Sequence, residues 1–311
     1  MAQPPFQHVA VVGAGAVGGF FGARLALAGH RVTLIARPVH VAATLRDGLR
    51  LQTGGRVETA RVAASTDLAA VQGADLVLFC VKSTDTETTA RELAPLLDAG
   101  AVLLSLQNGV ENAAMIVRHV SQPVVPAVVY VAAAMAGPGT VAHFGRGDLV
   151  IGPFGGRAAP LHAIADFFAA AQVPVRVSND VMAELWNKLM VNCAFNAISG
   201  LAQANYGQLA ALAEVRELMD GVVREVVALA RAEHVDLPLD TALQAVERIA
   251  QAMPAQLSST AQDMARRKPS EIDHLNGFVA RRGRELNVPV PLNHALHALV
   301  KLVEATHVAA A

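Results

Sequence analysis

Polar residues recur at every fourth position in the segment ELWNKLMVNCAFNAISG, which spans residues 184–200. They are Lys188, Asn192 and Asn196, and most of the residues around them are apolar. Positions i, i+4 and i+8 of a helix lie along one face, so the three side chains form a single row. Lysine is almost never buried without a partner, and a buried amide must be hydrogen-bonded. The row therefore either faces solvent as a polar seam or lines a pocket that binds a ligand.

A lysine in such a row can protonate the oxygen of a ketone while a hydride adds to its carbon. Partial burial lowers the pKa of a lysine toward the operating pH, whereas a neighbouring carboxylate keeps the ammonium group charged. The two amides offer N–H donors and carbonyl acceptors, which suit a substrate that carries both a charge and a hydroxyl group. If the row lines a pocket, these residue types suit proton transfer to a bound polar substrate.

A second candidate site is the sequence GAGAVG at residues 13–18, which fits the pattern G-x-G-x-x-G. It follows a strand-like run and opens a helix-like one, the context in which this pattern binds the pyrophosphate of a dinucleotide. Gly13 allows a tight turn, Gly15 lets the phosphates approach the backbone, and Gly18 lets helix and strand pack closely. The predicted cofactor-binding residues of this turn are Gly13, Ala14, Gly15, Ala16, Val17 and Gly18.

Three residues that follow strands are candidate cofactor contacts, and the first of them indicates which dinucleotide binds. The strand at 31–37 ends in Arg37, and no carboxylate follows until Asp47. A carboxylate there would repel a ribose 2′-phosphate, whereas a guanidinium binds it, so we predict NADPH. A solvated arginine is the alternative. Lys82 and Asn108 follow two further strands, and ligands of open α/β sheets lie beyond those ends.

The elements that position these residues fall into two domains. Apolar strand-like runs alternate with helix-like stretches in the first half, which predicts a parallel sheet covered on both faces. We predict a domain boundary near 178–180, giving a Rossmann domain at 1–178 and an all-α domain at 179–311. The expected strands are 8–13, 31–37, 75–81, 102–109 and 123–135, with a helix at 16–29 and a hairpin at 140–153. The expected helices of the second domain are 180–199, 208–234, 239–253, 255–266, 270–287 and 292–308, followed by a frayed tail at 305–311.

Composition excludes several classes of protein. The formal net charge is −1, and no basic tract suits nucleic acid or an anionic membrane. No run reaches the ~20 continuous apolar residues of a membrane span, and we expect no signal peptide. The two cysteines, Cys80 and Cys193, lie in apolar segments, which is typical of a reduced cytoplasmic protein. His30, His143 and His274 are not spaced as metal ligands, so we predict no metal. Whether the chain forms a homodimer stays open.

From about residue 8 to residue 302 the chain resembles the ketopantoate reductases, which are 2-dehydropantoate 2-reductases. The most specific parts of the resemblance are the helix containing W-x-K-L-x-x-N-x-x-x-N and the segment with SS, QD and EID. The resemblance implies an N-terminal Rossmann domain and an all-helical second domain. It rests on the motifs GAGAVGG, LAGHRVTLIAR, VKS, LQNG, ELWNKLMVNCAFNAISGL, SSTAQDM and SEIDHLNGF.

Carried over by position, the resemblance assigns a role to each candidate residue. It implies that Lys188 is the proton donor and that Glu271 acts on the cofactor or in catalysis. One departure is Tyr206, where some members have an asparagine before the glycine at 207; Asn205 is adjacent and could substitute. The implied cofactor contacts are Arg37, Lys82, Asn108, Ala134 and Glu271, with Ala134 after a strand. The implied substrate contacts are Asn108, Lys188, Asn192, Asn196, Ser258 and Ser259.

The expected activity is NADPH-dependent reduction of 2-dehydropantoate to (R)-pantoate in pantothenate biosynthesis. One alternative keeps the fold and cofactor but reduces another branched or hydroxylated 2-oxo acid, and its support is the change at Tyr206. The other alternative is a non-catalytic protein that senses NADPH, which would have no need for a proton-donating lysine.

Overall fold

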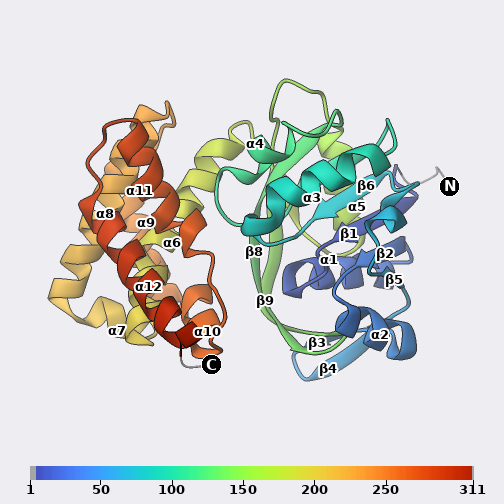
Figure 1. Cartoon of the computed structure of the whole chain (residues 1–311), viewed down its shortest axis with the longest axis horizontal. Coiled ribbons are helices and arrows are strands. Elements are labelled where there is room, and N and C mark those ends of the chain that lie inside the picture. The colour runs from blue at the N-terminus through green and yellow to red at the C-terminus, as the bar shows by residue number, and fades with distance from the viewer. Residues whose placement is uncertain (1–4, 310–311) are drawn as a thin grey trace. The chain divides into compact units, whose positions relative to one another are not determined.

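The computed structural model of the chain describes residues 5–309 and divides into two compact units, the first ending at Val181 and the second beginning at Met182 (Figure 1). The first unit contains a large sheet with helices, and the second is helical. Within the described residues, no helix combines the length and the apolar character needed to cross a membrane.

A run of parallel strands forms the centre of the first unit. Its order is β5-β2-β1-β6-β7-β8, which is the order 3-2-1-4-5-6 typical of dinucleotide-binding sheets. The order reverses between β1 and β6, and this reversal marks the edge where ligands of such sheets bind. The predicted Rossmann-type fold is therefore confirmed. The strands are β1 (His8–Val12), β2 (Arg31–Ile35), β5 (Ala63–Ser65), β6 (Leu76–Phe79), β7 (Val102–Ser105) and β8 (Val124–Gly137).

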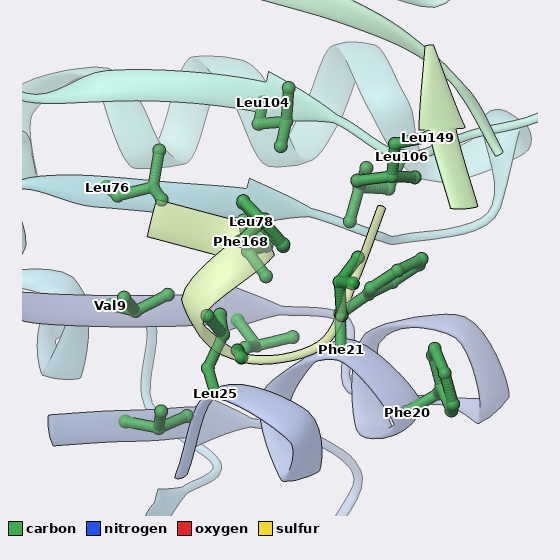
Figure 2. Packing of buried hydrophobic residues seen from close by; sticks show 14 of the residues in the cluster. Val9, Phe20, Phe21, Leu25, Leu76, Leu78, Leu104, Leu106, Leu149 and Phe168 are labelled. Atoms are coloured by element: carbon green, nitrogen blue, oxygen red, sulfur yellow. The ribbon is translucent and has the colours of Figure 1, made fainter. Parts of the chain in front are cut away.

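Alternate residues of these strands enter two separate cores, because successive side chains of a strand point to opposite faces. On one face Phe21 and Phe168, from α1 and α5, pack against strand residues such as Leu78 (Figure 2). On the other face Leu93 of α3 and Ile116 of α4 pack against the strands and complete the second core. The helices of this unit are α1 (Ala16–Leu27), α2 (Pro38–Asp47), α3 (Thr86–Leu93), α4 (Asn112–Ile116) and α5 (Leu161–Ala170).

The segment 140–153 contains one long strand, so the hairpin that we predicted within it is wrong. β9 (Thr140–Ile151) instead pairs antiparallel with β8. Gly147 is an extra residue in this pairing, since Tyr130 faces Asp148 while Val131 faces Arg146. Arg146 and Gly147 have φ values of 57° and 140°, and the chain absorbs the extra residue as a bulge without reversing. Beyond β9 the sheet continues with β3 (Leu49–Thr53), β4 (Arg56–Ala60) and β10 (Val175–Val177).

The second unit is all-helical over its described residues, as predicted. The predicted helix at 208–234 is two helices, because Leu212 between them is extended, with φ −94° and ψ 127°. The tail predicted to fray from 305 stays helical to Ala309, and residues 310 and 311 lie outside the described part. The helices are α6 (Val181–Ala202), α7 (Tyr206–Ala211), α8 (Ala213–Ala232), α9 (Leu239–Ala252), α10 (Ser259–Ala265), α11 (Asn276–Glu285) and α12 (Pro291–Ala309).

Two other predicted helices begin later than expected. The helix predicted at 255–266 begins at Ser259, because Ser258 caps it by accepting a hydrogen bond from the backbone N–H of Ala261 at 3.0 Å. The helix predicted at 270–287 begins at Asn276, after the short 3-10 helix η4 (Ile272–His274). Leu275 separates these two, since its φ of −113° and ψ of −107° are not helical.

Candidate active site

The glycine turn lies where the strand order reverses, between the ends of β1 and β6. Gly13 has a φ of +83°, and a Cβ atom on it would lie 2.6 Å from the backbone nitrogen of Val81. A Cβ on Gly18 would lie 2.8 Å from Cγ1 of Val11, so this glycine lets α1 pack closely on β1. Both glycines are therefore required by the fold, as the motif predicts.

Gly15 differs from these two glycines, because the fold itself leaves space above it. A Cβ on Gly15 would meet only the carbonyl oxygen of Gly13, at 4.0 Å. Gly15 is also the N-cap of α1, and neither a side-chain cap nor an acidic residue occupies the first turn of this helix. A helix N-terminus with open space above it fits a pyrophosphate, so the turn passes this test for a dinucleotide.

The other residues of the turn contribute in different ways. Ala16 and Val17 begin α1, where backbone N–H groups have no carbonyl partner within the helix. The N–H of Ala14 donates instead to the carbonyl of Ile35 at 3.0 Å, and the residue is buried. Ala14 can therefore line a cofactor site but cannot donate its amide hydrogen to the phosphates.

Arg37 lies two residues beyond β2 and is the N-cap of α2. The residue is exposed, and the first turn of α2 contains no acidic residue. The helix therefore presents its positive end beside the guanidinium. This combination of charges suits a phosphate group.

Lys82 and Asn108 follow β6 and β7, at the same edge of the sheet as the glycine turn. Their loops contact each other, because the Ser83 hydroxyl donates to the carbonyl of Asn108 at 3.2 Å. The structure thus brings together two of the predicted cofactor residues. Ala134 does not follow a strand as we predicted: it lies within β8, opposite Ala142 of β9, because pairing with β9 prolongs β8 to Gly137.

In the second unit, α6 carries the predicted row of polar residues. Lys188 and Asn192 are half-buried, and Asn196 is buried with 2 % of its surface exposed. Other faces of the same helix enter the core, where Trp186 packs edge-on against Phe278 at a ring distance of 5.7 Å. The row is therefore a polar strip on a largely buried helix.

Two serines at the start of α10 lie against the end of this row. Asn196 donates through Nδ2 to the hydroxyl of Ser259 at 3.3 Å, and Ser259 is exposed. The hydroxyl of Ser258 donates to the carbonyl of Asn196 at 3.3 Å and also caps α10, and the residue is buried. Ser259 is therefore the better placed of the two to contact a ligand, while Ser258 holds α10 on α6.

A buried network that the sequence pattern did not reveal holds the middle of α6. Asn276 donates through Nδ2 to the carbonyl of Cys193 at 3.1 Å and to Oδ1 of Asn293 at 3.0 Å. Asn293 in turn donates to the carboxylate of Glu225 at 2.8 Å, and neither asparagine is exposed. This network fixes α6 one residue beyond Asn192. Periodicity could not single out Asn276, because it opens a helix of mixed apolar and charged residues, NGFVARRGRE.

Glu271, the predicted acidic residue, precedes η4 and is half-buried. Its neighbours attach this segment to α12. Ser270 donates both its N–H and its hydroxyl to Glu304, at 2.8 and 2.7 Å. Asp273 accepts hydrogen bonds from His297 and Lys301, which hold the pKa of this carboxyl well below its usual range. The backbone around Glu271 is therefore held on both sides. Within residues 5–309, no group of three or more potential metal ligands gathers.

Comparison with known proteins covers both units. The family model described as ketopantoate reductase PanE/ApbA matches residues 9–156, and the model of its C terminal region matches residues 180–304. The chain belongs to the ketopantoate reductase family. It is 33% identical over 302 residues to a 2-dehydropantoate 2-reductase of Halobacterium salinarum, covering 96% of this chain and 99% of that protein. It is 32% identical over 299 residues to one of Vibrio cholerae, covering 96% and 98%.

A solved structure is also similar over nearly the full length. It is a PanE/ApbA family ketopantoate reductase from Ralstonia eutropha JMP134, 54% identical in sequence, with a TM-score of 0.91. The match covers 96% of this chain and 99% of that one. The family resemblance inferred from the sequence motifs is therefore confirmed.

The departure from the family pattern at Tyr206 has a structural explanation. The Tyr206 ring stacks on Phe195 of α6, with ring centroids 4.2 Å apart, and burial raises the pKa of its hydroxyl to about 12. Asn205 caps α7, because its side chain accepts from the N–H of Gln208 at 2.9 Å. The side-chain oxygen of Asn205 is thus already used within the fold, and Tyr206 is part of the core of the second unit.

The contrast between Gly15 and Gly18 leads to a testable difference. Gly18→Ala should destabilise the fold by about 1–3 kcal/mol, because the added methyl group overpacks the contact between α1 and β1. Gly15→Ala should lower the melting temperature much less and weaken the binding of a nicotinamide dinucleotide about tenfold, since its methyl group occupies the open space above the turn where the phosphates would accept hydrogen bonds. Thermal melts and calorimetric titrations of both variants test this. Unchanged affinity for the dinucleotide in folded Gly15→Ala would show that the phosphates bind elsewhere.

Proposed function

We propose that this chain reduces ketopantoate to (R)-pantoate with NADPH, in the synthesis of pantothenate. The observation that carries the proposal is the row of Lys188, Asn192 and Asn196 on α6, next to Ser259. It occurs in a chain that aligns over nearly its full length with proteins named 2-dehydropantoate 2-reductase. We assign cofactor binding to the first domain, 1–178, and substrate binding and catalysis to the second, 179–311.

The cofactor residues of the proposal are those of the first unit. The space above Gly15 and the N-terminus of α1 suit the pyrophosphate of a nicotinamide dinucleotide. Arg37 favours NADPH over NADH, because a guanidinium binds a 2′-phosphate through charge-assisted hydrogen bonds. Lys82, Asn108 and the backbone at Ala134 supply further contacts. When bound, NADPH supplies the hydride that reduces the substrate carbonyl carbon.

The residues of the second unit handle the substrate and the proton. Lys188 donates a proton from Nζ to the carbonyl oxygen as negative charge develops there. Asn192 and Asn196 bind the carboxylate and hydroxyl groups of the substrate, with Ser259 as an additional hydroxyl donor. Glu271 is the residue that we propose for keeping the ammonium group charged before transfer.

The two cysteines bear on the location of the protein in the cell, and Tyr206 bears on the choice of substrate. Cys80 and Cys193 are free thiols, which supports the proposed cytoplasmic location. The alternative, another branched or hydroxylated 2-oxo acid, keeps its support from the change at Tyr206: this side chain stacks on Phe195 and the Asn205 side-chain oxygen caps α7, so neither replaces the asparagine that some family members have there.

An assay with purified chain, NADPH and ketopantoate tests the proposed function. We expect the near-ultraviolet absorbance of the reduced nicotinamide to fall as NADPH is oxidised. Pantoate should appear in an equal amount, measured by mass spectrometry. Tight NADPH binding without turnover of ketopantoate or any other 2-oxo acid would refute the proposal in favour of a sensor protein.

Asn192→Ala should act on the substrate alone. A neutral hydrogen bond contributes about 0.5–1.5 kcal/mol, so KM for ketopantoate should rise roughly 2- to 12-fold while NADPH affinity stays constant. Asn187→Ala is a matched control, because Asn187 is also half-buried on α6 but lies outside the row. If Asn192→Ala changed NADPH affinity, or if both variants raised KM equally, Asn192 would not be a substrate contact.

A further inference from the structure

Buried polar side chains gather where β6 and β7 end. Each of them is exposed over 6 % of its surface or less, and none is among the residues assigned to cofactor or substrate above. They come from the 3-10 helix η2 (Ser83–Asp85), the start of α3, the end of β7 with the loop after it, and the start of α4, and they form one connected set of hydrogen bonds. The residues are Ser83, Thr86, Ser105, Gln107 and Asn112.

Thr86 is the hub of this set. Its hydroxyl accepts a hydrogen bond from Nε2 of Gln107 at 2.6 Å and donates one to Oδ1 of Asn112 at 2.8 Å. Both hydrogen bonds are buried. Thr86 itself has no exposed surface, so it cannot touch a ligand.

Two backbone carbonyls determine the direction of every bond in the network. Nδ2 of Asn112 donates to the carbonyl of Asn108 at 2.6 Å, so its Oδ1 must be the atom facing Thr86. Nε2 of Gln107 donates to the carbonyl of Val81 at 3.0 Å, so the same nitrogen faces Thr86. Thr86 can therefore accept only from Gln107 and donate only to Asn112. Such directed chains of buried hydrogen bonds are cooperative, and a missing member leaves a buried polar atom without a partner.

The carbonyls at the two ends of the chain belong to the loops that hold the proposed cofactor residues. Val81 directly precedes Lys82, and the second carbonyl is that of Asn108 itself. Ser83 adds a hydrogen bond from the first loop to the same carbonyl at 3.2 Å. The network therefore couples the backbone position of one loop to that of the other.

We propose that Thr86 is a positioning residue for the cofactor: through Gln107 and Asn112 it sets the spacing of the loops that carry Lys82 and Asn108. This inference rests on the proposed function, in which those two residues contact NADPH. Loss of the hydroxyl group removes the link through Gln107 and leaves the hydrogen bonds of Ser83 as the remaining connection, so that Asn112 holds the carbonyl of Asn108 less firmly. The affinity for NADPH then falls, although nothing that touches the cofactor has been changed.

A matched pair of substitutions tests the inference. Thr86→Val removes the hydroxyl group at nearly constant volume, whereas Thr86→Ser retains it. We expect Thr86→Val to raise the Kd for NADPH about fivefold, measured by calorimetry well below the melting temperature, and Thr86→Ser to stay within about twofold of the parent. A lower melting temperature for Thr86→Val with an unchanged Kd would show a purely structural role and overturn the inference.

A double-mutant cycle with Asn108→Ala shows whether the effect passes through Asn108. If it does, Thr86→Val should weaken NADPH binding much less in the Asn108→Ala background than in the parent. Strictly additive losses, or no loss from Asn108→Ala alone, would overturn the inference. If Thr86→Val fails to fold, Ser83→Ala replaces it in the cycle, with an expected loss of about twofold. Failure of the parent chain to bind NADPH would refute the proposed function, and with it this inference.

Discussion

Lys188→Ala is expected to lower kcat by ~10²–10⁴-fold, the range typical of a positioned general acid. The helix should survive, because alanine has the highest helix propensity and Lys188 is only half-buried on α6. NADPH binding should also survive, since the glycine turn and Arg37 belong to the other unit. The measurement is turnover of ketopantoate by folded variant that is saturated with NADPH.

Two further substitutions separate proton donation from charge. Lys188→Arg keeps a positive charge but replaces the ammonium with a guanidinium that does not release its proton, so kcat should stay low while KM for ketopantoate largely recovers. Lys268→Ala is the control for loss of a lysine in the same unit, because Lys268 is exposed between α10 and η4. Turnover by Lys188→Ala within a few-fold of the parent would remove Lys188 from the mechanism.

Arg37→Ala is expected to weaken NADPH binding roughly tenfold to more than a hundredfold, because a hydrogen bond to a charged group contributes about 1.5–3 kcal/mol. NADH binding should change little, since NADH has no 2′-phosphate. Arg31→Ala is the matched control: Arg31 is also exposed, but it lies at the opposite end of β2. Calorimetric titration with both cofactors tests this prediction. Equal losses for NADPH and NADH in Arg37→Ala would show that this residue does not read the phosphate.

Sequence periodicity predicted the parts of the fold that bury continuous apolar surface. Runs such as HVAVV and LVLF could be recognised because a strand covered on both faces is almost continuously apolar. It missed β3 and β4, whose residues are mostly exposed and pair only at the edge of the sheet. It also misread β9, because glycines at 145 and 147 are typical of a turn in the sequence but form a bulge in the strand.

The candidate site divides in a similar way. The glycine turn and the row on α6 were visible, because their spacing matches the geometry of one turn or one helix face. The networks around Thr86 and Asn276 were not, since the side-chain hydrogen bonds that Thr86 and Asn276 themselves make join residues 17 to 83 positions apart. No local pattern marks such pairs. The two serines of the SS motif look equivalent in the sequence. Only the structure shows that the Ser258 hydroxyl caps α10.

In the proposed function, the polar row on α6 recognises ketopantoate itself, and not 2-oxo acids in general. Trimethylpyruvate differs from ketopantoate only by lacking the hydroxyl group, so the ratio of kcat/KM for the two substrates with NADPH measures recognition of that hydroxyl. A hydrogen-bonding group left without its partner costs about 1–3 kcal/mol, so ketopantoate should be preferred roughly 5- to 150-fold. A ratio near one, or a preference for trimethylpyruvate, would contradict the assignment of ketopantoate as the substrate.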